Sequence, residues 1–310
     1  MFLTIINALF PVAFVIFLGW IAGRFKIIDP NQSSHFATYV MSFSFPCLLF
    51  IITATTKLSV LLDVRFVAAF AIGLMGTFVI SFFIHKHIMK RNAHESGQAA
   101  FVCSFPDMAF MGIPIFIELL GSKALISIVV GNIITSVIMI PVVIILLESK
   151  NENKANILKK TFLQIILVFK KPLIFAPIAG VLYALIGVPL PNVVEHSLKL
   201  IGETTSGVSL FALGLIMSGF ALKLSRGVFL NIGIKNILQP LIMLGLVVLF
   251  GITGIMSVEL VLLCAMPTAT MTTMFAIRYQ ALTEESTSSA ILGTIFSLVT
   301  LTIFMLIMGI

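Results

Sequence analysis

The stretch FVCSFPDMAFMGIPIF, residues 101–116, decides how the rest of the chain is interpreted. It is largely apolar, yet it is interrupted by Pro106, Asp107, Gly112 and Pro114. Proline removes a backbone donor and clashes with the preceding helical turn, and glycine tolerates unusual dihedral angles. A carboxylate in hydrocarbon is costly unless it serves a function. We therefore expect an interrupted membrane helix that carries the working site.

The composition around this stretch is that of a polytopic membrane protein. Of the 310 residues, 59% are hydrophobic and 10% are charged, and the mean hydropathy is +1.17, which lies outside the usual composition of soluble domains. The net charge of +7 does not indicate nucleic-acid binding, because no basic region is interleaved with aromatic residues. The three cysteines have no CxxC spacing, so we expect no disulfide framework, no metal and no cofactor.

Ten apolar segments are long enough to cross a hydrocarbon core of about 30 Å as helices. They lie near residues 3–23, 33–52, 65–88, 97–120, 123–147, 172–190, 197–221, 228–250, 258–279 and 285–309. The fold class is therefore an all-α membrane protein with ten transmembrane helices. The longest polar connection, residues 148–171, is expected to be a cytoplasmic linker between a first five-helix repeat, 1–147, and a second, 172–310.

The basic residues predict the orientation of the chain in the cell membrane. With the N-terminus outside, fifteen Lys and Arg residues, Lys235 among them, fall on the cytoplasmic side and four fall outside. Both termini are then extracytoplasmic. Because five helices per half is an odd number, the second half enters from the opposite side, and any repeat between the halves is inverted.

Such a repeat is visible when the chain is compared with itself at a constant offset of 161 residues. The matched pairs are Pro11 with Pro172, Gly19 with Gly180, Pro30 with Pro191, Asn31 with Asn192, and Leu49-Phe50 with Leu210-Phe211. The same register places FVCSFPDMAFM over LLCAMPTATMT, residues 262–272. One register held from the first helix to the fourth predicts an internal repeat.

The repeat identifies a second interrupted segment, in which Pro267 precedes the threonines Thr268, Thr270, Thr272 and Thr273. Both interrupted segments are the fourth of their half. Corresponding interrupted helices indicate the midplane site of a transporter, where half-helix N-termini present free N–H groups and a positive dipole end to an anion. This setting favours a small carboxylate or another anionic solute.

Two motifs at these positions resemble the auxin efflux carrier family, which includes plant PIN carriers and bacterial malate or malonate permease-like proteins. DMAFMGIP, residues 107–114, is similar to the family's helix-four motif of Asn, several apolar residues and Gly-Ile-Pro. MFAIRY, residues 274–279, is similar to the Phe-Ala-x-x-Tyr ending of helix nine. With the five-plus-five layout, the resemblance covers nearly the whole chain.

The resemblance implies a crossed-helix fold with a scaffold domain and a transport domain, elevator-type alternating access, and a homodimer. The unwound parts of helices four and nine would cross near the substrate, and Pro114 matches the helix-four crossover proline. Two residues depart from the family pattern. Asp107 stands where asparagine is usual, and Thr272 stands where plant members carry the helix-nine crossover proline.

Asp107 is the carboxylate that we place near the middle of the membrane. A buried carboxylate can bind H⁺ or Na⁺, because desolvation disfavours its bare charge and a cation restores the balance. Asp107 is therefore the candidate for the coupling ion. The alternative is a structural aspartate that caps the second half of helix four.

The other candidate residues also have two interpretations. The helix-break residues either hold two helices open or make ordinary proline kinks, the threonines either donate to a substrate carboxylate or satisfy freed carbonyls, and Asn132 either contacts the substrate or joins two helices. The expected helix-break residues are Pro106, Gly112, Pro114 and Pro267. The expected substrate-binding residues are Asp107, Gly112, Pro114, Asn132, Pro267, Thr268, Thr270 and Thr272.

The leading hypothesis is a secondary transporter of small organic anions, either a dicarboxylate such as malate or malonate or an auxin-like carboxylate, coupled to H⁺ or Na⁺. One alternative is a cation/proton antiporter or a Na⁺-coupled steroid-anion carrier of similar fold. A second is a membrane sensor with a transporter-like core. An enzyme is not expected, because the sequence has no GxSxG, no HExxH and no paired intramembrane carboxylates.

Overall fold

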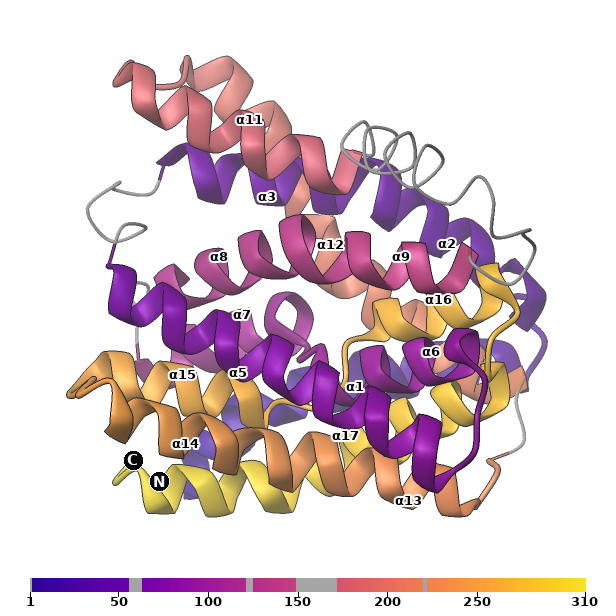
Figure 1. Cartoon of the computed structure of the whole chain (residues 1–310). Coiled ribbons are helices and arrows are strands. Elements are labelled where there is room, and N and C mark those ends of the chain that lie inside the picture. The colour runs from indigo at the N-terminus through magenta and orange to yellow at the C-terminus, as the bar shows by residue number, and fades with distance from the viewer. Residues whose placement is uncertain (1, 56–62, 121–124, 149–171, 220–221) are drawn as a thin grey trace, which may run out of the picture.

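The computed structural model describes residues 2–55, 63–120, 125–148, 172–219 and 222–310 (Figure 1). Each of the ten predicted segments coincides with helix, and the only β-type pairing among these residues is one isolated bridge. The linker predicted at 148–171 lies, except for Glu148, outside the described residues. The prediction of an all-α membrane protein is confirmed.

The first half contains α1 (Phe2–Arg24), the 3₁₀ turn η1 (Pro30–Gln32), α2 (Ser33–Tyr39), η2 (Val40–Ser44), α3 (Phe45–Thr55), α5 (Val64–Phe83), η3 (Ile84–Ile88), α6 (Ala93–Ser104), η4 (Met108–Gly112), α7 (Ile113–Leu120), α8 (Leu125–Ile134), η6 (Thr135–Met139) and α9 (Ile140–Glu148). The second half contains α11 (Pro172–Ile186), α12 (Asn192–Gly219), α13 (Arg226–Gly233), η9 (Ile234–Leu238), α14 (Gln239–Leu249), α15 (Ile255–Ala265), α16 (Thr270–Tyr279) and α17 (Thr283–Ile307).

Six continuous helical stretches in the described part of the chain are long and apolar enough to cross a membrane. They are Pro30–Thr55, Val64–Ile88, Val130–Glu148, Asn192–Gly219, Arg226–Leu249 and Thr283–Ile307. Three further apolar helices are shorter: Phe10–Arg24, Phe175–Ile186 and Ile255–Ala265. The fourth and ninth predicted segments are each divided between two helices.

Prolines explain most of the π-helical turns. η2, η4, η6 and η9 each end two residues before a proline: Pro46, Pro114, Pro141 and Pro240, respectively. Proline has no N–H and its ring clashes with the carbonyl four residues back. A wider turn accommodates the ring, so that the helix continues past the proline.

The helices pack into two bundles (Figure 1). In the first bundle, α1 packs along α12, α11 packs along α3, and α12 also packs against α3. In the second bundle, α5 packs on α6 and α14, α14 on α15, α6 on α9, and α17 on α13 and α16. α12 and α1 of the first bundle contact η4, α7 and α16 of the second. Both interrupted segments belong to the second bundle and lie against the first.

Glycines make close helix contacts in the first bundle, and two of these contacts resemble each other. A Cβ atom at Gly19 would collide with the carbonyl oxygen of Phe211, and one at Gly180 would collide with the Thr53 hydroxyl and lie 2.6 Å from the carbonyl oxygen of Phe50. Small residues let helix backbones approach closely in membranes, where dispersion contacts replace the hydrophobic driving force. α1 therefore meets α12 in the same way that α11 meets α3.

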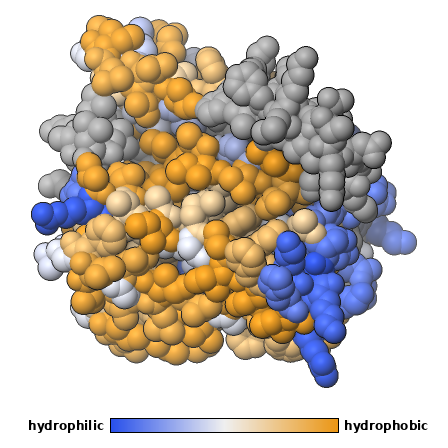
Figure 2. All heavy atoms as spheres, viewed as in Figure 1, coloured by the Kyte–Doolittle hydropathy of each residue, from blue (hydrophilic) through white to orange (hydrophobic). Residues whose placement is uncertain are grey.

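The surface of the protein fits a lipid environment. Figure 2 shows that apolar residues cover most of the visible face, while hydrophilic residues gather mainly at one end. The exposed large side chains include Phe10, Phe14, Phe175, Leu182 and Val299. An apolar face of this extent on a soluble protein would be an aggregation site, whereas in a bilayer it is solvated by lipid.

Candidate functional site

The two interrupted segments cross in the second bundle and hydrogen-bond to each other. Phe105–Asp107, between α6 and η4, runs antiparallel to the residues between α15 and α16, with Pro106 bridged to Thr268. The Asp107 amide donates to the Pro267 carbonyl at 2.9 Å, and the Ala269 amide donates to the Phe105 carbonyl at 2.8 Å. Each segment thereby satisfies backbone groups that the other leaves open, as a non-helical backbone inside a membrane requires.

The predicted helix-break residues divide into two pairs. Pro106 and Pro267 lie in the non-helical segments of the crossing. Gly112 and Pro114, which we expected to take part in the break, lie instead in helical turns, Gly112 at the end of η4 and Pro114 in α7. The Gly112 amide donates to the Asp107 carbonyl, five residues back, at 3.0 Å. This π-type bonding restores the helix directly after Asp107, so the interruption is short.

The carboxyl ends of both half-helices are capped by side chains from one neighbouring stretch. Lys235, in η9, donates from Nζ to the carbonyl oxygens of Cys264 at 2.9 Å and Met266 at 2.6 Å. Gln239, one turn later, donates from Nε2 to the carbonyl oxygen of Ser104 at 2.7 Å. The last carbonyls of a helix have no partner within it and carry the negative end of its dipole. A cation therefore caps α15 and a neutral amide caps α6.

The position of Lys235 corrects the prediction that counted it among cytoplasmic basic residues. Its side chain is buried, with 2% exposed, within the apolar stretch Arg226–Leu249. The signal was present in the sequence, because a lysine flanked on both sides by apolar helix is a functional candidate in a membrane protein. Asp107 is also not the only buried carboxylate: Glu259, in α15, is 4% exposed.

Asp107 lies directly after the crossing, with 3% of its surface exposed. It is the last residue before η4, and it is within electrostatic reach of the Lys235 ammonium. Its N–H donates across the crossing to the Pro267 carbonyl, and its own carbonyl accepts from the Gly112 amide of η4. The predicted carboxylate is thus under the electrostatic influence of a buried cation that was expected on the cytoplasmic side.

The threonines of the second interruption have different environments. The Thr272 hydroxyl donates to the Ala269 carbonyl at 2.9 Å and lies 3.4 Å from the hydroxyl of Thr268. The Thr273 hydroxyl is buried and has no hydrogen-bond partner among the described residues. Thr272 thus satisfies a freed carbonyl, which is the structural alternative considered for these residues.

Thr270 is the first residue of α16 and lines a small cavity of about 10 Å³. The cavity is shared by both bundles, because its other walls come from η2 and α12 and include Met41 and Ser209. No side chain caps the first turn of α16, since its N-cap residue is Ala269. The free N–H groups of that turn form a positive end that favours an anion. A volume this small holds about one water molecule, so the site is closed in this conformation.

Asn132 is buried in α8, and its amide nitrogen has no hydrogen-bond partner in the described part of the chain. α8 packs against η4: a Cβ atom on Gly131 would collide with the side chains of Met108 and Phe70. Asn132 therefore sits on a helix that supports the start of the second half of the interrupted segment. Either role considered for it remains compatible with this position.

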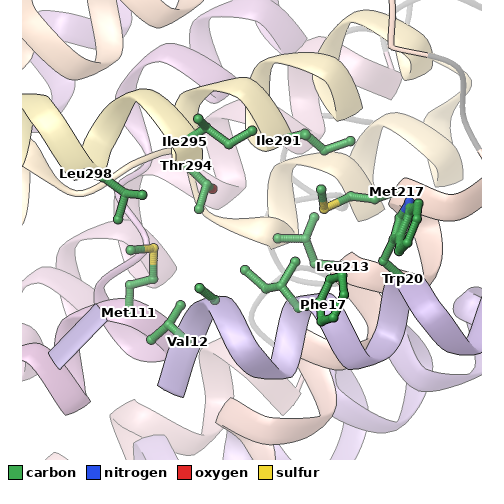
Figure 3. A pocket seen from close by; sticks show the side chains of 12 residues that line it. Val12, Phe17, Trp20, Met111, Leu213, Met217, Ile291, Thr294, Ile295 and Leu298 are labelled. Carbon is green, nitrogen blue, oxygen red and sulfur yellow. The ribbon is translucent and has the colours of Figure 1, made fainter. Parts of the chain in front are cut away.

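A larger cavity of about 360 Å³ lies between the two bundles (Figure 3). Its walls come from α1, α12 and α17, with Met111 of η4 at one side, and most of the lining side chains are apolar. In Figure 3, Phe17 and Trp20 of α1 lie across the cavity from Ile291 and Ile295 of α17. The two bundles are thus incompletely packed where α1 faces α17.

A polar network that the sequence analysis missed joins the ends of the helices in the second bundle. Arg91 makes a bidentate ion pair with Glu285, at 2.8 and 2.6 Å, and Asn231 donates to Glu285 and to Ser289, each at 3.0 Å. A paired, hydrogen-bonded charge is tolerated where an isolated one is not.

The described residues contain no group of His, Cys, Asp and Glu able to hold a metal ion.

Comparison with known proteins identifies the family. Residues 4–305 match the family described as membrane transport protein. The chain belongs to the membrane transport protein family. One relative in this family is the uncharacterized transporter YfdV of Escherichia coli K12, which is 27% identical over 304 residues, 95% of each chain. The auxin efflux carrier component 6 of Arabidopsis thaliana is 26% identical over 147 residues, 45% of this chain and 26% of the plant protein.

Membership of the membrane transport protein family confirms the resemblance to auxin efflux carriers at the level of the family. The protein is a multi-pass membrane transporter and not an enzyme. Its likeness to malate or malonate permeases stays a prediction, because the relative that matches along the whole chain is an uncharacterized transporter.

Proposed function

We propose that this member of the family is a secondary transporter of small organic anions that works by alternating access. The observation that carries the proposal is the crossing of the two interrupted segments, with an uncapped helix N-terminus beside Thr270 at the boundary between the two bundles. Free N–H groups and a positive dipole end suit a carboxylate. The partial match to an auxin efflux carrier component is in accord with such a substrate.

We further propose that the protein has ten transmembrane helices arranged as two inverted repeats, 1–147 and 172–310. The two glycine contacts support this, because Gly19 and Phe211 are the counterparts of Gly180 and Phe50 at the offset found in the sequence. An offset one residue longer pairs Phe105 with Pro267 and Asp107 with Ala269. At that offset the two hydrogen bonds of the crossing are equivalent, because in each the later residue of one segment donates to the earlier residue of the other. Both chain ends lie at the same end of the bundle (Figure 1), in accord with extracytoplasmic termini.

The proposed motion is an elevator-type displacement of the second bundle, which carries the crossing, against the first. The 360 Å³ cavity and the small cavity at Thr270 both lie between the bundles, where contacts must change. Interfaces of this kind have discrete alternative packings. Asp107 is the proposed carrier of the coupling ion, H⁺ or Na⁺, because its buried carboxylate gains from a bound cation.

The direct test is transport by the purified full-length protein in proteoliposomes. Vesicles loaded with unlabelled malate, malonate or indole-3-acetate would be diluted into the same labelled anion, and counterflow would be measured. We expect counterflow of at least one of these anions. Uptake that never exceeds that of protein-free vesicles, for these and a wider panel of organic acids, would contradict the proposal.

Two variants locate the site within this assay. Thr270→Val removes the hydroxyl beside the N-terminus of α16, and we expect anion affinity to fall by about tenfold, the equivalent of one charged hydrogen bond. Thr302→Val is the matched control, because the Thr302 hydroxyl donates only to the Leu298 carbonyl of its own helix, at 2.7 Å. Equal loss in both variants would remove Thr270 from the site.

Asp107→Asn tests the coupling separately from binding. The amide is similar in shape but cannot take up a proton or hold a cation with a full negative charge. We expect flux to continue while its dependence on the imposed pH or Na⁺ gradient weakens. Unchanged coupling in this variant would leave Asp107 with the structural role that was its alternative.

A further inference from the structure

At the carboxyl end of α15, a lysine side chain of the same protein occupies a position where a cation could bind. Two carbonyl oxygens at this end, those of Cys264 and Met266, converge on the Lys235 ammonium at 2.9 and 2.6 Å. Unwound carbonyls and half-helix carboxyl ends are the groups that coordinate Na⁺ in transporters with interrupted helices. In this protein the carbonyl groups at the end of α15 already accept hydrogen bonds from the Lys235 ammonium.

We propose that the Lys235 ammonium is a resident cation that occupies the place of Na⁺ at this crossing, so that neither folding nor transport requires Na⁺. The inference rests on the proposed function only where it concerns transport. Of the two coupling ions considered for Asp107, it selects H⁺.

Negative groups around the crossing attract a cation to the Lys235 position. Asp107 lies within electrostatic reach of Lys235, and the carboxyl end of α15 adds the negative end of a helix dipole. These groups offset part of the cost of burying an ammonium. The carboxyl end of α6 is capped by the neutral amide of Gln239. A charged side chain therefore caps α15 and an uncharged one caps α6.

The attachment of Lys235 makes it a fixed part of the site. It lies in the π-helical turn η9, and the next residue, Asn236, donates to the Gly293 carbonyl of α17 at 2.8 Å. Two of the three N–H donors of the ammonium are used by the α15 carbonyls. A Na⁺ ion would have to displace this group and leave a buried ammonium without partners, which costs far more than the ion gains.

The test is the thermal unfolding of the purified full-length protein in detergent, in NaCl and in choline chloride at equal concentration. For the wild type, we expect the same midpoint in both salts. For Lys235→Met we expect a lower midpoint in choline and a rise of about 3 °C or more in Na⁺, because the freed carbonyls now accept the ion. Lys223→Met is the matched control, since the Lys223 side chain is exposed and its ammonium donates to the side chain of Glu284 at 2.8 Å.

Each outcome decides the proposal. A dose-dependent stabilisation of the wild type by Na⁺ overturns it, and this measurement needs no variant. If Lys235→Met does not fold, Lys235→Ala, which also frees both carbonyls, is measured in its place. A Lys235 variant that folds and shows no Na⁺ response also overturns the proposal, as does an equal response in Lys223→Met.

These outcomes are independent of the anion assay. A protein that is stabilised by Na⁺ and still carries out anion counterflow would retain the proposed function and lose this inference. A protein without counterflow whose Lys235 variants gain a Na⁺ response would do the reverse.

Discussion

The two halves of the crossing pair with each other through their backbones and differ in their side-chain chemistry. In the first half, the helix that ends at Ser104 is capped by Gln239, and the returning helix starts after Asp107. In the second half, the helix that ends at Ala265 is capped by Lys235, and the returning helix starts at Thr270. The negative charge thus belongs to one half of the crossing and the positive cap to the other.

Both caps come from the second half of the chain. At the offset found in the sequence, Lys235 corresponds to Leu74 and Gln239 to Phe78, and both of these apolar side chains are buried in α5. These two positions are therefore apolar in the first half, while in the second half they carry the side chains that cap the carbonyls of Ser104, Cys264 and Met266. Apolar and polar side chains can both occupy such positions, because helix packing depends mainly on volume and shape there.

The largest effect should come from replacing the two caps by apolar residues. Lys235→Met leaves two buried carbonyls without their charged donor, and we expect a loss of about 3–5 kcal/mol in unfolding free energy. Gln239→Leu removes a single neutral hydrogen bond and should cost about 1–3 kcal/mol. Thermal unfolding in one detergent, with choline as the only cation, would rank the two variants.

Lys235→Gln sharpens this ranking. The amide retains a donor for the α15 carbonyls but not the charge, so its midpoint should fall between those of Lys235→Met and the wild type. Equal midpoints for the Met and Gln variants would mean that the charge alone matters. A Gln239→Leu variant less stable than Lys235→Met would reverse the assignment of the stronger cap.

A second comparison of the halves concerns the glycine contacts of the first bundle. A Cβ at Gly19 meets backbone atoms of α12 that cannot move independently, whereas the nearest atom at Gly180 is the Thr53 hydroxyl. Gly19→Ala should therefore cost about 1–3 kcal/mol by overpacking, and Gly180→Ala should cost less. Gly76, in α5, has no atom within 4 Å of the added methyl group, so Gly76→Ala is the neutral control. Equal losses at Gly19 and Gly76 would exclude close backbone packing as the cause.

The fold was largely predictable from the sequence because it depends on patterns that the sequence displays. The ten apolar segments, the crossing prolines Pro106 and Pro267, and the offset that relates Gly19 to Gly180 all follow from hydropathy and self-comparison. The predicted ends of the helices lie within a few residues of those in the structure. The place of the interruption within its segment did not, because Gly112 and Pro114 are compatible with both a break and a π-helical turn.

The site was predictable only in part, because its polar contacts join residues far apart in the chain. Asp107 and Thr270 could be located from the motif and the repeat, but counting charges by side of the membrane grouped Lys235 with the cytoplasmic basic residues although it lies inside an apolar segment. The bond from Gln98 to the Thr272 carbonyl, at 2.8 Å, likewise joins positions that no local pattern relates. Tertiary packing alone decides which buried carbonyl each donor reaches.

The smallest expected effect distinguishes two neighbouring threonines of the second half. Thr272→Val removes a hydroxyl that donates to the Ala269 carbonyl, so we expect a loss of about 1 kcal/mol. Thr273→Val removes a buried hydroxyl that has no partner among the described residues, so stability should be unchanged or slightly higher. Thermal unfolding without substrate measures both effects. If Thr273→Val unfolds at the wild-type temperature but loses anion counterflow, its hydroxyl is held unpaired for the transported ligand, and the asymmetry of the crossing extends to substrate binding.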